Sequence, residues 1–273
     1  MSEHVMNRMT EEEYRKNPGV NKSTLWDIRK SPAHYKWAVD HQDEQEDTQA
    51  LRMGRAIHMS VLQPEEFMEH YVVAPGVDKR TKEGKKIWEE FFAENEGCEV
   101  LSQDEFDTIK EISKSVVKET PMIPWWAAET EVPLFWVDPR TGIRCKCRVD
   151  AIVPLRGQTI VIDLKTTTDA SSTAFVRDAL RFGYHVQAAH YLNGIKAARP
   201  ELKNPEWWFV AVEKKPPYAV NVLKADDGFL DAGQFKLMEL MDKLDDCMRV
   251  DQYPGYGTNT IVMPSWATGG GEE

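Results

Sequence analysis

Two short apolar runs in the middle of the chain each carry a carboxylate, and a lysine follows the second carboxylate by two positions. These residues are Asp150, Asp163 and Lys165. Residues two apart in a strand share a face, so we expect Asp163 and Lys165 to point the same way, with Leu164 turned to the other side. Paired carboxylates repel one another unless a cation lies between them. The set therefore predicts a hard divalent ion, Mg²⁺ or Mn²⁺, and hydrolysis of a phosphodiester in which Lys165 orients the water or stabilises charge on the phosphate.

A surface explanation of the same triplet is two exposed turn carboxylates beside a surface lysine. The neighbouring residues argue against it, because Val161 and Ile162 make the strand apolar and internal. A buried charge without a partner costs several kcal/mol, roughly. An Asp/Lys face on an internal strand therefore needs a functional reason.

Three further residues have side chains suited to the same site. His58 follows Gly54 by four positions in a helical pattern, and Gln187 and Tyr191 are also four apart, which places each pair on one helix face. Each of these residues alone is also explained as an ordinary structural histidine, or as part of a helix surface or core edge. Glu131 is interpreted either as an acid behind the metal site or as a surface residue.

The elements that must position these residues follow from apolar periodicity and turn signals. After a polar lead-in we expect two short helices between residues 21 and 40, and then an acidic loop at 41–48. A polar, mobile segment is expected at 75–86. The remaining helices are expected at 49–62, 85–95, 102–119, 171–181, 183–198 and 226–249. The strands are expected at 131–137, 143–153, 159–165, 207–212 and 219–223, with the last two forming a hairpin. Asp150 and Asp163 should lie near the ends of neighbouring strands. The pattern predicts one α/β domain with a mixed central sheet flanked by helices and a helical N-terminal extension.

The composition narrows the class of protein. The 273 residues carry a net charge of −11, which argues weakly against nucleic acid as a partner but leaves room for a local basic channel. No apolar run reaches the roughly 18 residues of a membrane span, and we expect a cytoplasmic protein. The four cysteines form no CxxC pair and are expected to be buried or half-buried thiols.

Taken together, the motifs resemble those of a known nuclease family. In order they are Gly54-x-x-x-His58, Arg148-Val149-Asp150, Asp163-Leu164-Lys165-Thr166-Thr167, and Gly183 to Tyr191 with Gln187 inside it. This order is similar to that of PD-(D/E)xK nucleases of the RecB-like branch, and most of all to the nuclease domain of RecE, exonuclease VIII, and its phage and prophage relatives. The resemblance covers roughly residues 20–250. It departs from the family pattern at Val149, where the family has proline.

The resemblance implies a restriction-endonuclease-like fold and assigns roles to residues of this chain. His58, Asp150, Asp163 and the carbonyl of Leu164 would bind the metal, and Lys165 would be the catalytic lysine. Gln187 and Tyr191 would line the site and contact DNA or brace the lysine. For DNA contacts beyond these we expect Arg148 and Thr166, and more weakly Lys79 and Arg80 of the basic run at 79–86.

The resemblance also implies an activity and partners. RecE-like enzymes degrade linear double-stranded DNA 5′ to 3′ without ATP, leave a 3′ single strand for an annealing partner in recombination, and form a tetrameric ring. The sequence lacks the glycine-rich loop of a helicase. A structure-specific endonuclease or nickase with the same site, and a catalytically idle DNA-binding or assembly module, remain alternatives. We expect residues 1–20 to be a polar lead-in, 21–250 a single nuclease domain, and 251–273 a flexible tail.

Overall fold

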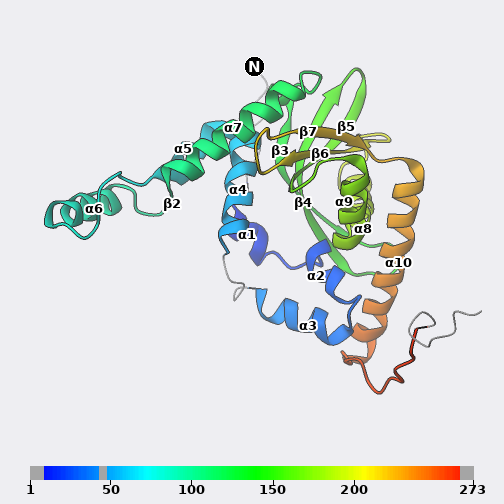
Figure 1. Ribbon diagram of the computed structural model, residues 1–273. Helices are drawn as coiled ribbons and strands as arrows, with labels where there is room; N and C mark the ends of the chain where they lie inside the picture. The colour runs from blue at the N-terminus through cyan, green and yellow to red at the C-terminus, as the bar shows by residue number, and fades with distance from the viewer. Residues whose placement is uncertain (1–8, 43–47, 265–273) are drawn as a thin grey trace, which may run out of the picture.

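A five-stranded mixed sheet forms the centre of the fold, as Figure 1 shows for the computed structural model, which describes residues 9–42 and 48–264. Its strands are β3 (Glu129–Val137), β4 (Arg144–Leu155), β5 (Gln158–Thr167), β6 (Glu206–Glu213) and β7 (Val220–Lys224). They lie in the order β3-β4-β5-β6-β7, and every neighbouring pair is antiparallel except β5 and β6. The mixed sheet and the β6–β7 hairpin are confirmed. The sheet puts β5, which carries Asp163 and Lys165, in its middle.

Helices cover both faces of this sheet. One layer consists of α2 (Lys22–Asp27), α3 (Pro32–Asp40), α8 (Ser172–Phe182), α9 (Tyr184–Ala198) and α10 (Asp227–Val250). Their buried side chains pack with those of β3, β4 and β6, and the thiols of Cys145 and Cys147 are buried in this core as expected. Neither α10 nor any other helix of the described residues is long and apolar enough to cross a membrane.

The opposite face is covered by α4 (Gln49–Leu62), α5 (Pro64–His70), α7 (Gln103–Glu119) and the 3-10 turn η2 (Trp125–Ala127). A second core lies here, in which Ile57 of α4 and Ile112 of α7 pack with Ile162 and Leu164 of β5. Leu164 is fully buried in it, so alternation along β5 directs Asp163 and Lys165 to the face of the first layer.

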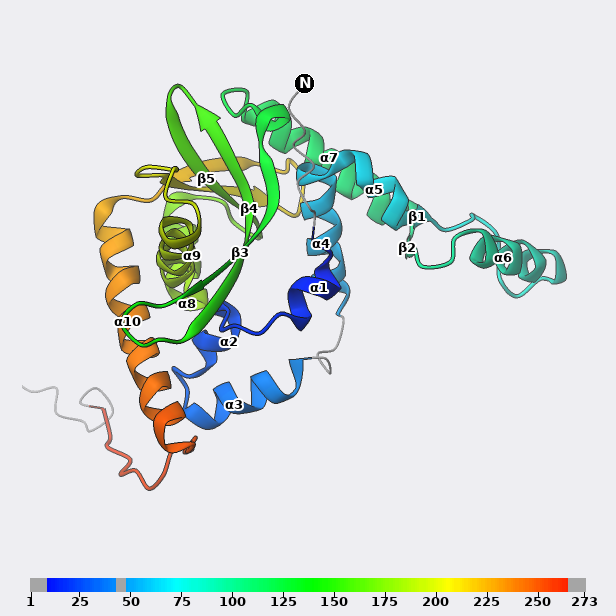
Figure 2. The same ribbon diagram turned by 180° about the vertical axis from the view of Figure 1, so that it is seen from behind.

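A long arm projects from the body between α5 and α7, as Figures 1 and 2 show from opposite sides. It consists of β1 (Tyr71–Val73), α6 (Lys82–Glu94) and β2 (Glu99–Leu101), and β1 and β2 pair in parallel. The sequence predicted a mobile polar segment at 75–86. The helix expected from residue 85 begins earlier, at Lys82, because Thr81 caps it. The Trp88 indole donates a hydrogen bond to the Val77 carbonyl at 3.1 Å, which joins the helix to the preceding loop, and the mobility of the segment stays a prediction.

Both ends of the described chain contact the body of the fold. The polar lead-in contains α1 (Glu11–Lys16), and the Lys146 ammonium on β4 donates hydrogen bonds to the carbonyls of Tyr14, Arg15 and Asn17. At the other end, Tyr253 stacks on Tyr35 with ring centroids 6.3 Å apart, and the flexibility of the tail stays a prediction. Residues 43–47 of the expected acidic loop and 265–273 of the tail lie outside the described residues.

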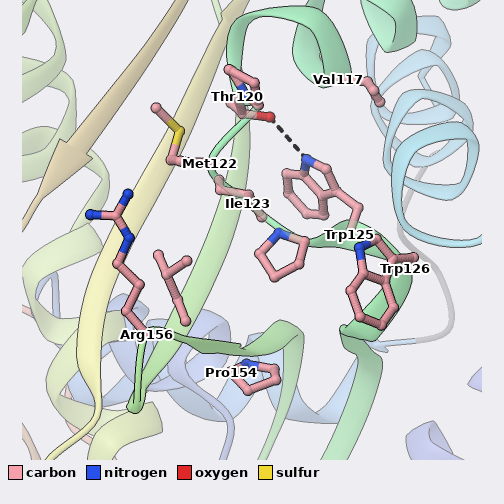
Figure 3. A pocket seen from close by; sticks show the side chains of 11 residues that line it. Val117, Thr120, Met122, Ile123, Trp125, Trp126, Pro154 and Arg156 are labelled. Atoms are coloured by element: carbon pink, nitrogen blue, oxygen red, sulfur yellow. Dashed lines mark hydrogen bonds between the residues drawn. The ribbon is translucent and has the colours of Figure 1, made fainter.

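A pocket of about 470 Å³ lies beside η2, at the β4–β5 hairpin tip (Figure 3). Trp125 in its wall donates a hydrogen bond to Thr120 Oγ1 at 2.9 Å, and Arg156 faces it from the hairpin. Its lining contains none of the residues predicted to do chemistry. This pocket is therefore separate from the candidate site.

Candidate active site

The candidate site lies where β4 and β5 separate. Their antiparallel pairing runs from Leu155–Gln158 to Ala151–Ile162 and stops there. Continuing the register by one residue places Asp150 opposite Asp163. Both carboxylates were expected near strand ends, but each lies in the interior of its strand. Beyond Asp150, β4 continues as a partner of β3 on one side, with Val20 bridged to Cys145 on the other.

Asp150 spans the gap between the two strands. Its Oδ2 accepts a hydrogen bond from the backbone N–H of Leu164 at 2.8 Å. The carboxylate thereby satisfies a backbone donor that the interrupted ladder leaves without a strand partner. The local chain geometry holds Asp150 beside Asp163 without any further residue.

Asp163 and Lys165 form an ion pair on one face of β5. The distance from Lys165 Nζ to Asp163 Oδ2 is 2.5 Å, and the Asp163 side chain is almost completely buried. Gln187 of α9 donates a hydrogen bond from its amide to Asp163 Oδ1. Asp163 is therefore held from both sides by residues that the sequence had placed at the site.

His58 brings a fourth element to this point. It lies on α4, and its Nδ1 is 3.7 Å from Asp150 Oδ2. The backbone of Leu164 also acts on the imidazole and opposes the lowering of its pKa, which places the Leu164 backbone at the same edge of the site. The separation of β4 from β5 thus exposes backbone and carboxylate oxygens to a histidine from the opposite helical layer.

Glu131 completes a cluster with His58 and Asp150. One potential ligand atom from each of the three lies within 4.8 Å of the others. Glu131 lies on β3 opposite Asp150, and its φ of 51° is in the left-handed region, which is costly for a residue other than glycine. The sequence left Glu131 between a supporting and a surface role. Nothing in the sequence signals the left-handed backbone that turns it inward.

Burial controls the ionisation of these groups in the metal-free protein. It raises the pKa of Asp150 above its usual range, that of Asp163 to about 6, and that of Glu131 to about 7. Burial, reinforced by Lys165, lowers the pKa of His58 to about 4, so its ring is neutral and able to bind a metal at pH 7. Burial opposes the charge of Lys165, but the carboxylates of Asp163 and Asp150 raise its pKa nonetheless.

The donor set fits a divalent cation. Three buried carboxylates lie close together here, and burial disfavours the ionised form of each. A bound cation would stabilise these ionised forms. Carboxylate and carbonyl oxygens with one neutral imidazole suit Mg²⁺ or Mn²⁺ better than softer metals. His58, Glu131 and Asp150 would hold such an ion, with Asp163 and the Leu164 carbonyl beside it.

Arg148 is at the site but already has anionic partners. Its Nε lies 2.6 Å from Glu131 Oε2, and its Nη1 forms an ion pair with Glu11 of α1. The sequence predicted a phosphate contact here. A phosphate would have to compete with Glu11 for the guanidinium, and the contact stays a prediction.

The other predicted residues are placed differently. Tyr191 is packed against Trp207 with ring centroids 5.7 Å apart, so its ring belongs to the core beneath the site. Thr166 follows Lys165 on β5, and alternation turns it to the opposite face. Lys79 and Arg80 lie on the projecting arm and are not brought to the site (Figure 2). Their contacts to DNA remain predictions.

Similarity to other proteins was found at the level of a family and of the fold. A family model described as "PDDEXK-like domain of unknown function (DUF3799)" matches residues 21–262. No protein of curated function matches the sequence. The crystal structure of a protein named "putative exonuclease", from Eubacterium rectale, is similar with a TM-score of 0.54 and 13% identity over 99% of each chain. This similarity shows a shared fold along the whole length of both chains.

Two further structures are similar at lower scores. A phage-related exonuclease from Haemophilus somnus 129PT gives a TM-score of 0.35 at 13% identity, over 86% of this chain and 97% of that one. The protein SSO0001 gives 0.31 at 16% identity, over 74% and 87%. The restriction-endonuclease-like fold expected from the sequence is confirmed by the family match, the mixed sheet and its flanking helices.

Proposed function

The chain belongs to the PDDEXK-like family DUF3799, and from that premise we propose that it is a metal-dependent nuclease that hydrolyses phosphodiester bonds in DNA. One observation carries this proposal. The Asp163–Lys165 ion pair lies buried on the central strand, directly beside Asp150 and the imidazole of His58. Such a concentration of charge is costly in a protein interior and is typical of a catalytic centre.

Each residue of the site would have a separate role in hydrolysis. A bound Mg²⁺ or Mn²⁺ would polarise a phosphoryl oxygen and lower the pKa of a coordinated water. Lys165 keeps its proton, because the neighbouring carboxylates raise its pKa, and its ammonium can donate a hydrogen bond to the attacking oxygen or to the phosphate as negative charge develops. Gln187 fixes the Asp163 carboxylate in place. His58 stays neutral, so its ring nitrogen is free to act as a ligand.

The finer part of the proposal is an ATP-independent exodeoxyribonuclease that degrades linear double-stranded DNA from 5′ to 3′. The resemblance to RecE-like nucleases supports it, and so does the name of the Eubacterium rectale protein, which shares the fold over its full length. The same resemblance supports a ring-shaped homo-oligomer, a role in recombination, and a single-strand annealing protein as partner.

The experiment that tests this uses three DNA substrates. Purified protein is incubated with linear duplex labelled at the 5′ end, with linear duplex labelled at the 3′ end, and with covalently closed circles, in Mg²⁺, Mn²⁺ or EDTA. An exonuclease releases mononucleotides from one end in Mg²⁺ and leaves circles intact. Cleavage of circles would establish the endonuclease or nickase instead. Binding without cleavage in every ion would establish an idle DNA-binding module.

Two variants connect the activity to the site. Asp163→Ala and Lys165→Ala should abolish digestion. Lys203→Ala, which removes an exposed lysine between α9 and β6, should leave it unchanged. Full activity in either site variant would refute the assignment of the site even if the protein is a nuclease.

A further inference from the structure

A second lysine lies buried at the edge of the site, and the proposed mechanism does not use it. Lys22 is the first residue of α2, and only 9% of its surface is exposed. Its ammonium donates a hydrogen bond to the carbonyl of Phe182, the last residue of α8, at 2.5 Å. Among the described residues, no carboxylate forms an ion pair with it. Lys22 is thus a buried cation with a neutral hydrogen-bond partner.

Lys22 and Lys165 share one aromatic ring. Their Nζ atoms lie 5.8 Å and 5.0 Å from the centroid of Tyr184, so the two ammonium groups are no farther apart than the sum of these distances. Lys22 also contacts the ring of Trp26 at 5.6 Å. Two cations therefore lie near the Tyr184 ring, one on the catalytic strand and one on the first helix of the neighbouring layer.

The turn at Gly183 builds this arrangement. Gly183 joins α8 to α9 with a φ of 72°, and a Cβ there would lie 2.8 Å from the ring of Trp26. Glycine therefore permits both the left-handed turn and the close approach of α2. The turn presents the Phe182 carbonyl to Lys22 and the Tyr184 ring to both lysines. The turn at Gly183 thus places the Lys22 ammonium beside Tyr184, at the edge of the site.

Burying the charged ammonium of Lys22 costs free energy that its hydrogen bond to a neutral carbonyl only partly offsets. Burial and the repulsion from Lys165 lower its pKa to about 8, which still leaves it mostly protonated at pH 7. A carbonyl accepts a hydrogen bond but supplies no negative charge. A buried cation of this kind is stabilised when an anion arrives beside it.

We propose that the Lys22 ammonium binds a non-scissile phosphate of the DNA strand, next to the scissile phosphate at which Lys165 acts. The inference rests on the proposed nuclease function. Lys165 forms an ion pair with Asp163, whereas no described carboxylate forms one with Lys22, on which Asp163 and Asp27 act only from a distance. An incoming phosphate therefore gains most at Lys22. Successive phosphates of one strand could then contact the two lysines beside Tyr184.

A purely structural role must be separated from this one. A lysine near the C-terminus of a helix also stabilises the last carbonyls and the helix dipole, and Lys22 does so for α8. The chain contains a matched control. Lys243 of α10 donates a hydrogen bond to the Ile28 carbonyl at the C-terminus of α2, at 3.0 Å. Lys243→Met removes a similar cap, but no residue of the site is involved.

The first measurement is DNA affinity as a function of salt. Wild type, Lys22→Met and Lys243→Met are titrated with a labelled duplex in EDTA at several salt concentrations, and thermal unfolding checks that each is folded. Loss of one charge-assisted contact should weaken binding by Lys22→Met about 10- to 100-fold. The slope of log affinity against log salt should fall by about 0.9, the value for one phosphate. Lys243→Met should match wild type in both quantities. Equal affinity and slope in Lys22→Met and wild type would overturn the proposal.

The second measurement changes the DNA, and the response of the wild type alone shows which phosphates are contacted. Comparison with Lys22→Met then shows whether Lys22 makes the contact. Single phosphates near the cleaved end are replaced one at a time by neutral methylphosphonates. Neutralising the phosphate beside the scissile one should lower kcat/KM of wild type about tenfold, and should lower that of Lys22→Met no further. Equal sensitivity of the two proteins at every position would refute the contact. If the wild type binds DNA but cleaves none, the nuclease proposal fails while the salt slopes still decide the role of Lys22. If it binds no DNA, both proposals fail.

Discussion

Replacing Glu131 by glutamine should stabilise the metal-free protein above neutral pH while weakening its metal binding. Burial raises the pKa of Glu131 from 4.5 to about 7, so the folded protein holds this proton more tightly than the unfolded chain does. The ionised form of Glu131 therefore opposes folding. Glutamine has the same shape and no charge, and it can still accept a hydrogen bond from Arg148.

The size of the effect follows from the shift and depends on pH. A group whose folded-state pKa is raised contributes stability below its unfolded pKa, and this contribution is lost as pH rises from 4.5 to about 7. Each pKa unit corresponds to about 1.4 kcal/mol. Glu131→Gln should therefore raise the free energy of unfolding by about 1 kcal/mol at pH 5 and by about 3 kcal/mol at pH 8.

Urea unfolding in EDTA at pH 5 and pH 8 measures this difference. The matched control is Glu129→Gln on the same strand, where the carboxylate pairs with Arg199 at 3.0 Å, outside the site. A partly exposed ion pair of that kind contributes about 0–1 kcal/mol, so its removal should destabilise slightly and nearly equally at both pH values. With Mn²⁺ present the order should reverse, because wild type gains stability from the bound ion and Glu131→Gln gains less.

Two results would refute this reasoning. If Glu131→Gln destabilises the metal-free protein at pH 8, the ionised carboxylate contributes more through Arg148 than burial costs it. If Mn²⁺ stabilises wild type and Glu131→Gln to the same extent, Glu131 is not a ligand, and its left-handed backbone needs another explanation.

Three further substitutions test the site. Lys165→Met should reduce cleavage at least about 100-fold. In urea unfolding it should also lower the free energy of unfolding by about 3–5 kcal/mol at pH 8, because Asp163 loses its ion-pair partner. The loss should be smaller at pH 5, where Asp163 takes up a proton. His58→Ala should weaken Mn²⁺ binding in calorimetry about tenfold, and higher Mn²⁺ should restore part of the activity. Glu11→Gln should free Arg148 for phosphate and raise duplex affinity up to about fivefold in fluorescence anisotropy.

Each of these expectations has a clear contrary outcome. Retained cleavage in Lys165→Met would remove this lysine from the reaction. Unchanged Mn²⁺ affinity in His58→Ala would remove His58 from the ligand set. Lower duplex affinity in Glu11→Gln would mean that Glu11 holds Arg148 in a binding position, rather than competing with the substrate for it.

The parts of the site that follow from short-range periodicity could be predicted from sequence. Asp163 and Lys165 share a face because they are two apart in a strand, and Asp150 meets them across one hairpin. The helix at 49–62 was bounded correctly, because its cap and its apolar stripe are both local. Its assignment to the site depended on the family resemblance, since no local rule relates α4 to β5.

Features that depend on long-range contacts could not be predicted in this way. The two strands of the arm have three residues each and pair across an intervening helix, so neither has a recognisable pattern of its own. The helix α1 is polar and buries no residue, and it is held by Lys146 on a strand 130 or so positions later. Glu131 turns inward through a backbone angle that a glutamate rarely adopts.

The electrostatic features of the site have a common origin. Glu131, Asp150 and Asp163 all have raised pKa values because they are buried together, while Lys22 has a lowered one because it is buried beside Lys165. Lys165 and Arg148 offset the charge of these carboxylates only in part, because the pKa values stay raised, and no described carboxylate forms an ion pair with Lys22. A metal ion and a DNA phosphate would supply the two missing charges. Metal binding should then release protons from the carboxylates near pH 6 to 7. In that pH range the carboxylates would therefore be fully ionised, as hydrolysis requires, only when the metal is bound.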